Sequence, residues 1–173
     1  MSKILIAYYS RKGENYWDGK VKNLDKGNTE IVAEMIADLT GGDLFEVDTL
    51  QPYPENYTKC TEVALEELKA KARPLLKSYP GGMDNYDTIF VGYPNWWGTM
   101  PMAMFTFLEH YDLSGKTIIP FCTNEGSGLG SSERDLKNLV KDGVVKSGFA
   151  IIGHKTLDAY DTVLEWIKEV CDK

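Results

Sequence analysis

Three stretches of the chain combine hydroxyl, amide, aromatic and glycine residues in ways that suit ligand contact. The first begins at Ser10-Arg11-Lys12-Gly13 and resumes at Gly27-Asn28-Thr29, where apolar residues start to recur at helical spacing. A helix N-terminus has unpaired N–H groups and a partial positive charge, so this stretch could hold a phosphate. Because Asn28 is also a good N-cap, an ordinary capped helix is the alternative.

The second stretch is YPNWWGTMP, from Tyr93 to Pro101, with Trp96 and Trp97 adjacent. Two neighbouring indoles in a loop cannot both be buried by the same face of a regular element. At least one is therefore expected to be exposed unless a flat ligand stacks on it. The alternative is that both tryptophans fold back on the core or contact another subunit.

The third stretch is TNEGSGLGSS, from Thr123 to Ser132, which can present backbone N–H and C=O groups to the edge of a heterocycle. Its glycines only weakly match the dinucleotide-binding fingerprint, which belongs to the first strand-to-helix turn of a domain. Ser132 followed by Asp135 also indicates a helix start, so part of the stretch is explained by capping.

The elements that must position these stretches alternate between strand and helix. Short apolar runs predict five strands, at 4–9, 44–47, 89–93, 117–121 and 149–152. Helical patterns lie between and after them, at 29–40, about 58–72, about 101–110, about 132–141 and 162–170. This alternation predicts an α/β fold, a three-layer, doubly wound parallel five-stranded sheet with strand order 2-1-3-4-5. In such sheets ligands bind beyond the carboxyl ends of strands 1, 3 and 4, where the three stretches follow, and the combination suggests FMN.

The sequence resembles the flavodoxins, most closely a flavodoxin-like subgroup with a split phosphate-binding loop. The motifs that carry the resemblance are LIAYYSRKGENY, GNTE, PYPENY, YPNWWGTMP and PFCTNEGSGLGSS, and together they cover essentially the whole chain. The resemblance implies noncovalent FMN, with its phosphate held by Ser10, Lys12, Asn28 and Thr29. It implies that the isoalloxazine ring is held by Pro94, Asn95, Trp96, Trp97, Gly98, Thr123, Glu125, Gly126, Ser127 and Gly128.

Two departures from the usual flavodoxin pattern bear on function. Short-form flavodoxins join the two halves of the phosphate loop directly, whereas this chain inserts roughly Gly13 to Lys26. The insert carries Tyr16 and Trp17, which could cover the flavin pocket or form a partner site, although a simple surface excursion is equally compatible. The stretch from Thr123 to Arg134 contains no aromatic residue, so one flavin face could be open to a nicotinamide or quinone, or covered by the insert or another subunit.

Composition limits the classes of partner. The 173 residues are expected to form a single domain, 1–173. Their net charge of −7 disfavours binding to nucleic acid or to anionic lipid. The same charge permits redox partners with basic docking surfaces. With no apolar run of roughly 20 residues and no separate signal peptide, no membrane association is expected and the location is taken as cytoplasmic. The cysteines and histidines are too scattered to predict a metal site. We expect a monomer or weak dimer.

The predicted function is FMN-dependent electron transfer, in which no catalytic residue is required because the flavin carries the redox chemistry. The alternative is an NAD(P)H-dependent FMN or quinone oxidoreductase of the same fold, which an open flavin face would favour. A receiver domain would need carboxylates after the first and third strands, and a cysteine phosphatase would need an arginine where Gly128 stands. Neither reading agrees with the sequence.

Overall fold

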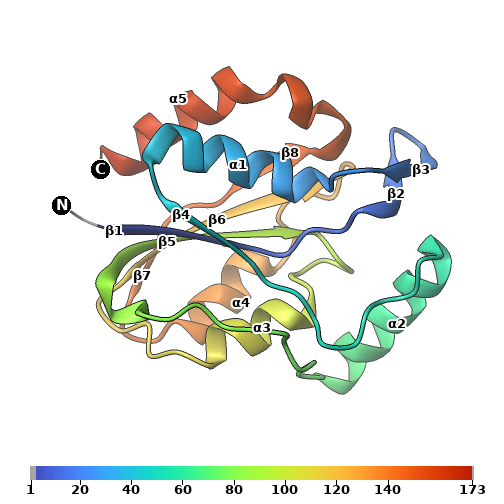
Figure 1. The fold of residues 1–173 in the computed structure, drawn as a ribbon, viewed down its shortest axis with the longest axis horizontal. Coiled ribbons are helices and arrows are strands. Elements are labelled where there is room, and N and C mark those ends of the chain that lie inside the picture. The colour runs from blue at the N-terminus through green and yellow to red at the C-terminus, as the bar shows by residue number, and fades with distance from the viewer. Residues whose placement is uncertain (1–2, 173) are drawn as a thin grey trace.

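The computed structural model describes residues 3–172, and its centre is a parallel sheet (Figure 1). The strands pair in the order β4-β1-β5-β6, and both β7 and β8 pair with β6 on its outer side. The predicted order 2-1-3-4-5 is therefore confirmed, with two short strands sharing the fifth position. The strands of the sheet are β1 (Lys3–Tyr8), β4 (Asp43–Glu46), β5 (Tyr86–Pro94), β6 (Thr117–Asn124), β7 (Val144–Val145) and β8 (Phe149–Ile152).

Helices cover both faces of this sheet, as expected for strands that are apolar on both sides. One face carries α1 (Asn28–Thr40) and α5 (Tyr160–Cys171), and the other carries α3 (Met102–Glu109) and α4 (Ser132–Leu139) (Figure 1). The remaining helix, α2 (Tyr57–Ala70), lies near the end where the parallel strands finish. All five predicted helices are present. Two 3₁₀ turns, η1 (Met83–Asn85) and η2 (Gly153–Asp158), complete the order.

The two cores follow from the alternation of side chains along the strands. In β1, Leu5 belongs to the core on the α3 and α4 side, whereas Ile6 packs with α1 and α5. The central strands are buried over most of their length, and Gly92 of β5 lies opposite Phe121 of β6. A Cβ at Gly92 would lie 2.1 Å from the Phe121 ring, so glycine is required for this ring to fill the core.

The insert between β1 and α1 is a β-hairpin, which the sequence had not predicted. Strand β2 (Gly13–Trp17) pairs antiparallel with β3 (Lys20–Leu24) through a two-residue turn at Asp18 and Gly19. Both turn residues have positive φ, 51° and 81°, as a tight hairpin with the right-handed strand twist requires. In Figure 1 the hairpin stands at the end of the sheet where the parallel strands finish.

The start of α1 differs from the prediction that Asn28 caps it. The N-cap is Gly27, and the hydroxyl of Ser10 accepts a hydrogen bond from the Glu30 N–H at 3.1 Å. A Cβ at Gly27 would lie 2.1 Å from the Ser10 Oγ, so glycine is what lets the segment after β1 approach the helix this closely. The cap therefore comes from a residue distant in sequence, and Asn28 occupies the first helical position.

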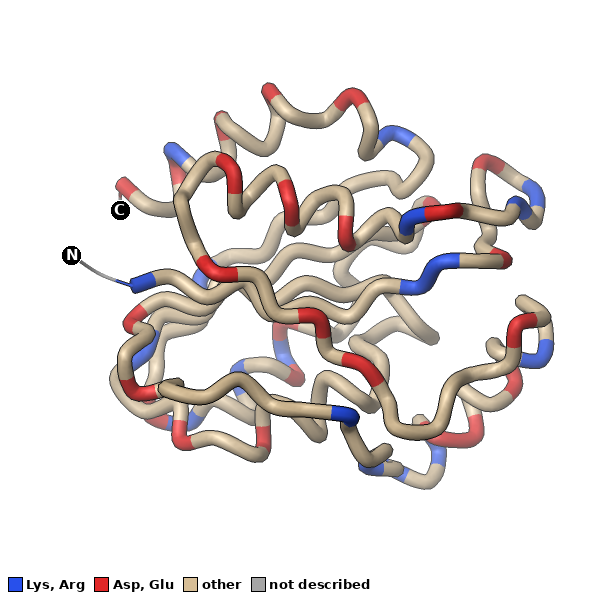
Figure 2. The backbone as a smooth tube through the Cα atoms, in the orientation of Figure 1, with Lys and Arg blue, Asp and Glu red and all other residues tan. Residues whose placement is uncertain are grey.

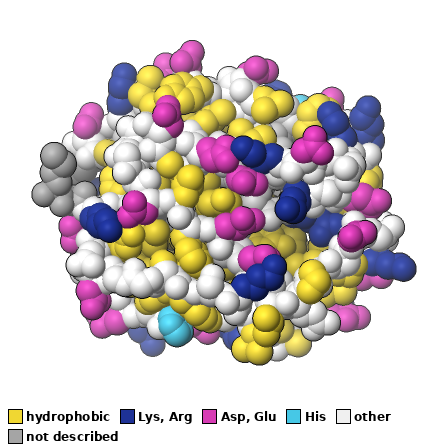
Figure 3. All heavy atoms as spheres, in the orientation of Figure 1, with side chains coloured by type: hydrophobic (Ala, Val, Ile, Leu, Met, Phe, Trp, Pro, Cys, Tyr) yellow, Lys and Arg dark blue, Asp and Glu magenta, His cyan; other side chains and the backbone are white. Residues whose placement is uncertain are grey.

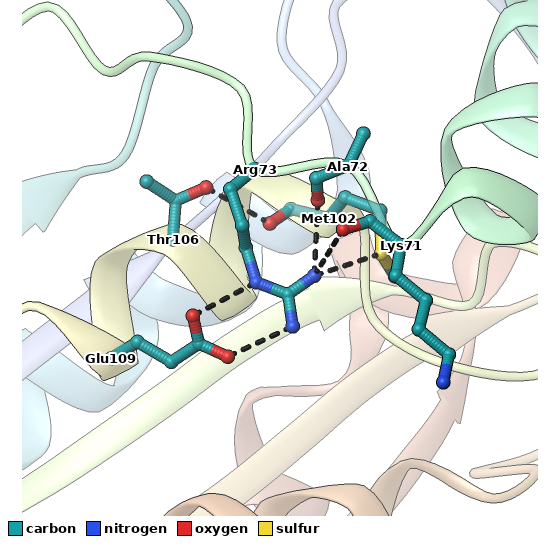
Figure 4. A network of polar contacts seen from close by, with 6 residues as sticks. All are labelled: Lys71, Ala72, Arg73, Met102, Thr106 and Glu109. Carbon is teal, nitrogen blue, oxygen red and sulfur yellow. Dashed lines mark hydrogen bonds and ion pairs between the residues drawn. The ribbon is translucent and has the colours of Figure 1, made fainter.

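An arginine fixes the far end of α2 against α3. The guanidinium of Arg73 donates to both carboxylate oxygens of Glu109, at 2.9 and 2.8 Å, and to the backbone carbonyls of Lys71 and Ala72 (Figure 4). Lys71 is the C-cap of α2 and Ala72 follows it, so the guanidinium binds carbonyls of the segment in which the helix ends. The contact sets the position of α2 beside the sheet. None of the helices in residues 3–172 has both the length and the apolar character needed to cross a bilayer.

Candidate functional site

A cavity of about 260 Å³ opens beyond the carboxyl ends of β5 and β6, beside the start of α1. Two larger cavities, of about 620 and 640 Å³, lie beside the segment leading from β4 to α2, and the larger of them is also lined by residues 9–14, which include Arg11. We take the smaller cavity as the candidate site because it lies at the switch point of the sheet, where doubly wound folds bind ligands. Its lining comprises Arg11, Asn15, Tyr16, Asn28, Thr29, Tyr57, Pro94, Asn95, Trp96, Thr123, Asn124, Glu125, Ser127 and Gly153.

The structure brings eight of the predicted residues together in this lining. They come from the start of α1 and from the loops after β5 and β6: Asn28, Thr29, Pro94, Asn95, Trp96, Thr123, Glu125 and Ser127. Six other predicted residues are not part of the lining: Ser10, Lys12, Trp97, Gly98, Gly126 and Gly128. The predicted convergence of three distant loops is present, although only part of each loop faces the cavity.

Most of the predicted residues that do not line the cavity have structural roles beside it. Ser10 caps α1, and Lys12 lines the neighbouring 640 Å³ cavity. Gly126 donates its N–H to the Asn124 side chain at 2.9 Å, and the Gly128 carbonyl accepts from the Asn95 side chain at 2.8 Å. These bonds hold the loop after β6 in shape, so the residues support the cavity without facing it.

The end of the cavity beside α1 suits an anion. The backbone N–H groups of Asn28 and Thr29 have no hydrogen-bond partner among residues 3–172. Such groups at a helix start carry the positive end of the helix dipole. The buried hydroxyl of Thr29 lies 2.8 Å from that of Thr123, which ties the first turn of α1 to the end of β6. This end of the cavity therefore combines oriented donors with a fixed backbone.

Arg11 adds a positive charge to the lining, and sequence reasoning had not placed it in the site. Its guanidinium donates to three backbone carbonyls, those of Glu14 at 2.9 Å, Pro54 at 3.0 Å and Glu55 at 2.8 Å. It takes part in none of the ion pairs formed within residues 3–172. Its charge is therefore not neutralised by a contacting carboxylate and is available to an anionic ligand.

The two adjacent tryptophans face different surroundings. Trp96 lines the cavity and packs edge-on against Tyr9 and Tyr53, with ring centroids 5.1 and 5.0 Å away. Trp97 is 52% exposed, and its indole N–H donates to the Thr61 carbonyl of α2 at 2.9 Å. The expectation that at least one indole is exposed is confirmed, and Trp96 is the one that can contact a flat ligand in the cavity.

A tight turn causes this separation. Trp97 and Gly98 have φ of 56° and 87°, and the Trp96 N–H donates to the Thr99 carbonyl at 2.9 Å across them. Positive φ is unusual for a bulky residue, and the turn directs the two indoles apart. Asn95 fixes the turn, since its Oδ1 accepts from the Gly98 N–H at 2.8 Å. Its amide also bonds the Gly128 carbonyl, so this one side chain connects the loops after β5 and β6.

A carboxylate and an imidazole meet where η2 borders the lining, close to the Asn28 side chain at the start of α1. Glu125 accepts from the His154 backbone N–H at 3.2 Å, and its other oxygen lies 2.6 Å from Nδ1 of the same histidine. Gly153 allows this approach, because a Cβ there would lie 2.4 Å from the Asn28 Nδ2 and 2.9 Å from the Glu125 Oε1. The glycine therefore leaves room for two polar side chains at the edge of the cavity.

The residues that sequence reasoning missed come mainly from the insert and from elements outside the three loops. Tyr16 was raised only as a possible cover, and Asn15, Tyr57, Asn124 and Gly153 were not selected. The Asp18-Gly19 pair is a hairpin signal that could have indicated an ordered insert. Tyr57, at the start of α2, ends the PYPENY motif, but the motif did not predict a role for this residue in the site.

The chemistry of the lining is that of a binding site. Burial raises the pKa of the Cys122 thiol, next to the site, to about 12, so the thiol stays protonated at neutral pH and is a poor nucleophile. Burial also raises the pKa of the Tyr9 hydroxyl. Within residues 3–172, no group of three or more His, Cys, Asp or Glu side chains is placed to hold a metal ion.

Comparisons with known proteins point to one family. A family model described as flavodoxin matches residues 3–170. The structure is similar to that of a protein described as a flavoprotein from Bacteroides eggerthii, with 31% identity, 100% of each chain covered and a TM-score of 0.77. A flavoprotein from Lactobacillus acidophilus in complex with FMN is 21% identical over 93% of this chain and 99% of its own, with a TM-score of 0.64. A Fusobacterium nucleatum flavodoxin bound to FMN is 16% identical over 98% of this chain and 96% of its own, with a TM-score of 0.55. No curated protein matches the sequence.

Proposed function

Because the chain belongs to the flavodoxin family, matched over residues 3–170, we propose that it binds FMN noncovalently and transfers electrons between partner proteins. When bound, FMN supplies the redox chemistry, and the protein contributes binding, orientation and exclusion of water. The observation that carries the proposal is the convergence, in one cavity, of a helix start suited to an anion and an aromatic wall suited to a flat ring.

The phosphate would be held at the α1 end of the cavity. The N–H groups of Asn28 and Thr29 and the guanidinium of Arg11 all belong to this lining, and none has a carboxylate partner in the described chain. A helix N-terminus stabilises an anion by about 0.3–1 kcal/mol, and by up to about 2 kcal/mol in partly buried geometry. The predicted contribution of Ser10 would be indirect, through the cap on α1.

The ring would lie against the loops after β5 and β6. Trp96 offers an aromatic surface supported by Tyr9 and Tyr53, and Thr123, Glu125 and Ser127 offer polar groups from the other loop. Asn95 connects the two loops and keeps the distance between them constant. A site prepared in this way loses little conformational entropy when a ligand binds.

A basic partner would dock beside α2. On this helix exposed Glu62 and Glu66 stand with exposed Lys59 and Lys69, so the net charge of −7 belongs to the whole chain rather than to this helix, and the docking anchor here is the exposed indole of Trp97, which donates to the Thr61 carbonyl. Acidic surface next to a buried redox site steers partners of opposite charge, and exposed aromatic residues are frequent anchors of interfaces. Acidic positions follow one another along α1 (Figure 2), and over the rest of the face shown in Figure 3 acidic and basic side chains are interspersed.

A reductase is the second candidate. The loop from Thr123 to Arg134 places no aromatic side chain over the cavity, which favours access of a nicotinamide or quinone to the ring from that side. The two functions differ in their reductant: a carrier is reduced by a partner protein, whereas a reductase turns over with NAD(P)H alone.

Titration of the purified protein with FMN tests the proposal. We expect a yellow complex, and FMN at 100 times its dissociation constant should raise the free energy of unfolding by about 2.7 kcal/mol. Riboflavin, which lacks the phosphate, should bind more weakly, and Arg11→Ala should reduce that difference. A folded protein that binds neither flavin would refute the proposal. Rapid anaerobic reduction of the bound flavin by NAD(P)H would select the reductase.

A further inference from the structure

We propose that the inserted hairpin is part of the flavin site: it closes one side of the cavity and places Tyr16, stacked on Tyr57, against the flavin ring. This inference rests on the proposed function and adds a recognition element to it. Tyr16 and Tyr57 both line the cavity, and their rings are stacked with centroids 6.4 Å apart and an interplanar angle of 27°.

The hairpin is held firmly on the α2 side of the cavity. The Glu14 carboxylate accepts a hydrogen bond at 2.7 Å from the N–H of Tyr57, the first residue of α2. Arg11 joins the base of the hairpin to the carbonyls of Pro54 and Glu55, just before this helix. A carboxylate at a helix N-terminus is also favoured by the helix dipole. Strand β2 and α2 therefore form one unit, and Tyr16 is placed by both.

The tip of the hairpin reaches the other side of the cavity. The Trp17 ring packs edge-on against His154, with centroids 5.8 Å apart, and Asp18 Oδ1 lies 3.7 Å from His154 Nε2. The same imidazole is bonded through Nδ1 to Glu125, which lines the cavity. The hairpin thus spans from α2 to η2, and it contacts the lining at both ends.

The loops after β5 and β6 leave an aromatic contact with the ring to be supplied by another part of the chain. The loop after β6 has no aromatic residue, and the turn at Trp97 directs that indole to α2. Within the described chain, the aromatic side chains that line the cavity are Trp96, Tyr16 and Tyr57. Stacking on aromatic side chains is a general way to hold a flat heterocycle. The hairpin therefore supplies the aromatic contact that the last loop lacks, and it restricts the approach of a second flat molecule to the ring.

Calorimetric titration of Tyr16→Ala with FMN and with riboflavin tests this role. We expect the dissociation constant for each flavin to rise about tenfold, which corresponds to about 1.4 kcal/mol. The ratio between the two constants should stay that of the wild type, because the ring is common to both and only the phosphate differs. Tyr16→Phe should bind like the wild type, since it keeps the ring.

The matched control is Val21→Ala, which removes an apolar side chain from the same rung of the hairpin. Val21 pairs with Tyr16, is 49% exposed and does not line the cavity, so its loss should leave both constants unchanged. Thermal unfolding of each variant without flavin verifies the fold, and Tyr16 is itself 44% exposed, so little stability should be lost. Wild-type affinity for FMN in Tyr16→Ala would overturn the inference, whereas failure of the wild type to bind FMN would overturn the proposed function instead.

Discussion

Gly153 offers a direct test of the geometry of the site, because the space that it leaves is filled by two residues of the cavity. In Gly153→Ala the added Cβ would lie 2.4 Å from the Asn28 Nδ2 and 2.9 Å from the Glu125 Oε1, well inside the 3.4 Å at which ordinary contact begins. Both clashing atoms are the tips of side chains, and both side chains line the cavity. The substitution should therefore displace these groups without deforming the backbone.

The expected effect falls on affinity rather than on stability. If Asn28 loses its contact with the phosphate, one hydrogen bond to a charged group is lost, at a cost of about 1.5–3 kcal/mol. The dissociation constant for FMN should then rise roughly 10- to 100-fold. Loss of the 3.2 Å bond between Glu125 and the His154 N–H should lower the free energy of unfolding by at most about 1 kcal/mol.

Calorimetric titration with FMN measures the first quantity, and urea denaturation of the flavin-free protein measures the second. Gly81→Ala is the matched control, because a Cβ at Gly81 meets nothing within 4 Å, and it should leave both quantities unchanged. Wild-type FMN affinity in Gly153→Ala, with the control behaving as expected, would show that Asn28 and Glu125 do not contact the ligand.

Three further predictions concern residues that stabilise the fold. Ser10→Ala removes the side-chain cap of α1 and should lower the free energy of unfolding by about 1 kcal/mol in urea denaturation; an unchanged midpoint would contradict the assigned cap. Gly92→Ala forces a Cβ against the Phe121 ring and should cost about 1–3 kcal/mol by the same measurement, whereas a neutral result would mean that the ring can move aside. Arg73 lowers the pKa of the Glu109 carboxyl, so this pair stabilises the fold above the ordinary value of 4.5, and the contribution is lost as the pH falls through the lower pKa of the folded state. Because the pair is partly exposed, Glu109→Gln should cost only about 0.5 kcal/mol at pH 7, and this difference from the wild type should vanish in strong acid.

The fold could be predicted because its elements have strong and different periods. Runs such as Ile89-Phe90-Val91, buried on both faces, alternate along the chain with segments whose apolar residues recur at helical spacing. The short strand Val144–Val145 was missed because two residues carry no periodic signal. The hairpin was missed because its strands are polar and carry no buried apolar run, β2 being mostly half-buried and β3 mostly exposed, although the Asp18-Gly19 turn was visible in the sequence.

The site could be predicted to the level of loops but not of side chains. The topology places the residues after β1, β5 and β6 at one edge, and that convergence follows from the strand order. Which of two neighbours faces inward depends on local backbone angles: a positive φ at Trp97 separates it from Trp96, and no pattern in the sequence distinguishes the two. The sequence favoured Lys12 rather than its neighbour Arg11 as a phosphate contact, but it is Arg11, held by the carbonyls of Pro54 and Glu55, that lines the cavity.

The buried hydroxyl pair of Thr29 and Thr123 has a consequence for engineering. These side chains are 94 positions apart in the chain, their hydroxyl oxygens are 2.8 Å apart in space, and the two residues are only 1% and 4% exposed. If the loop that contains Thr123 were replaced by the corresponding loop of a relative, the buried Thr29 hydroxyl would lose its hydrogen-bond partner unless the new loop supplied another one. Attempts to change ligand preference by exchanging one loop at a time should therefore fail at this junction, and exchanges that move both threonines together should succeed.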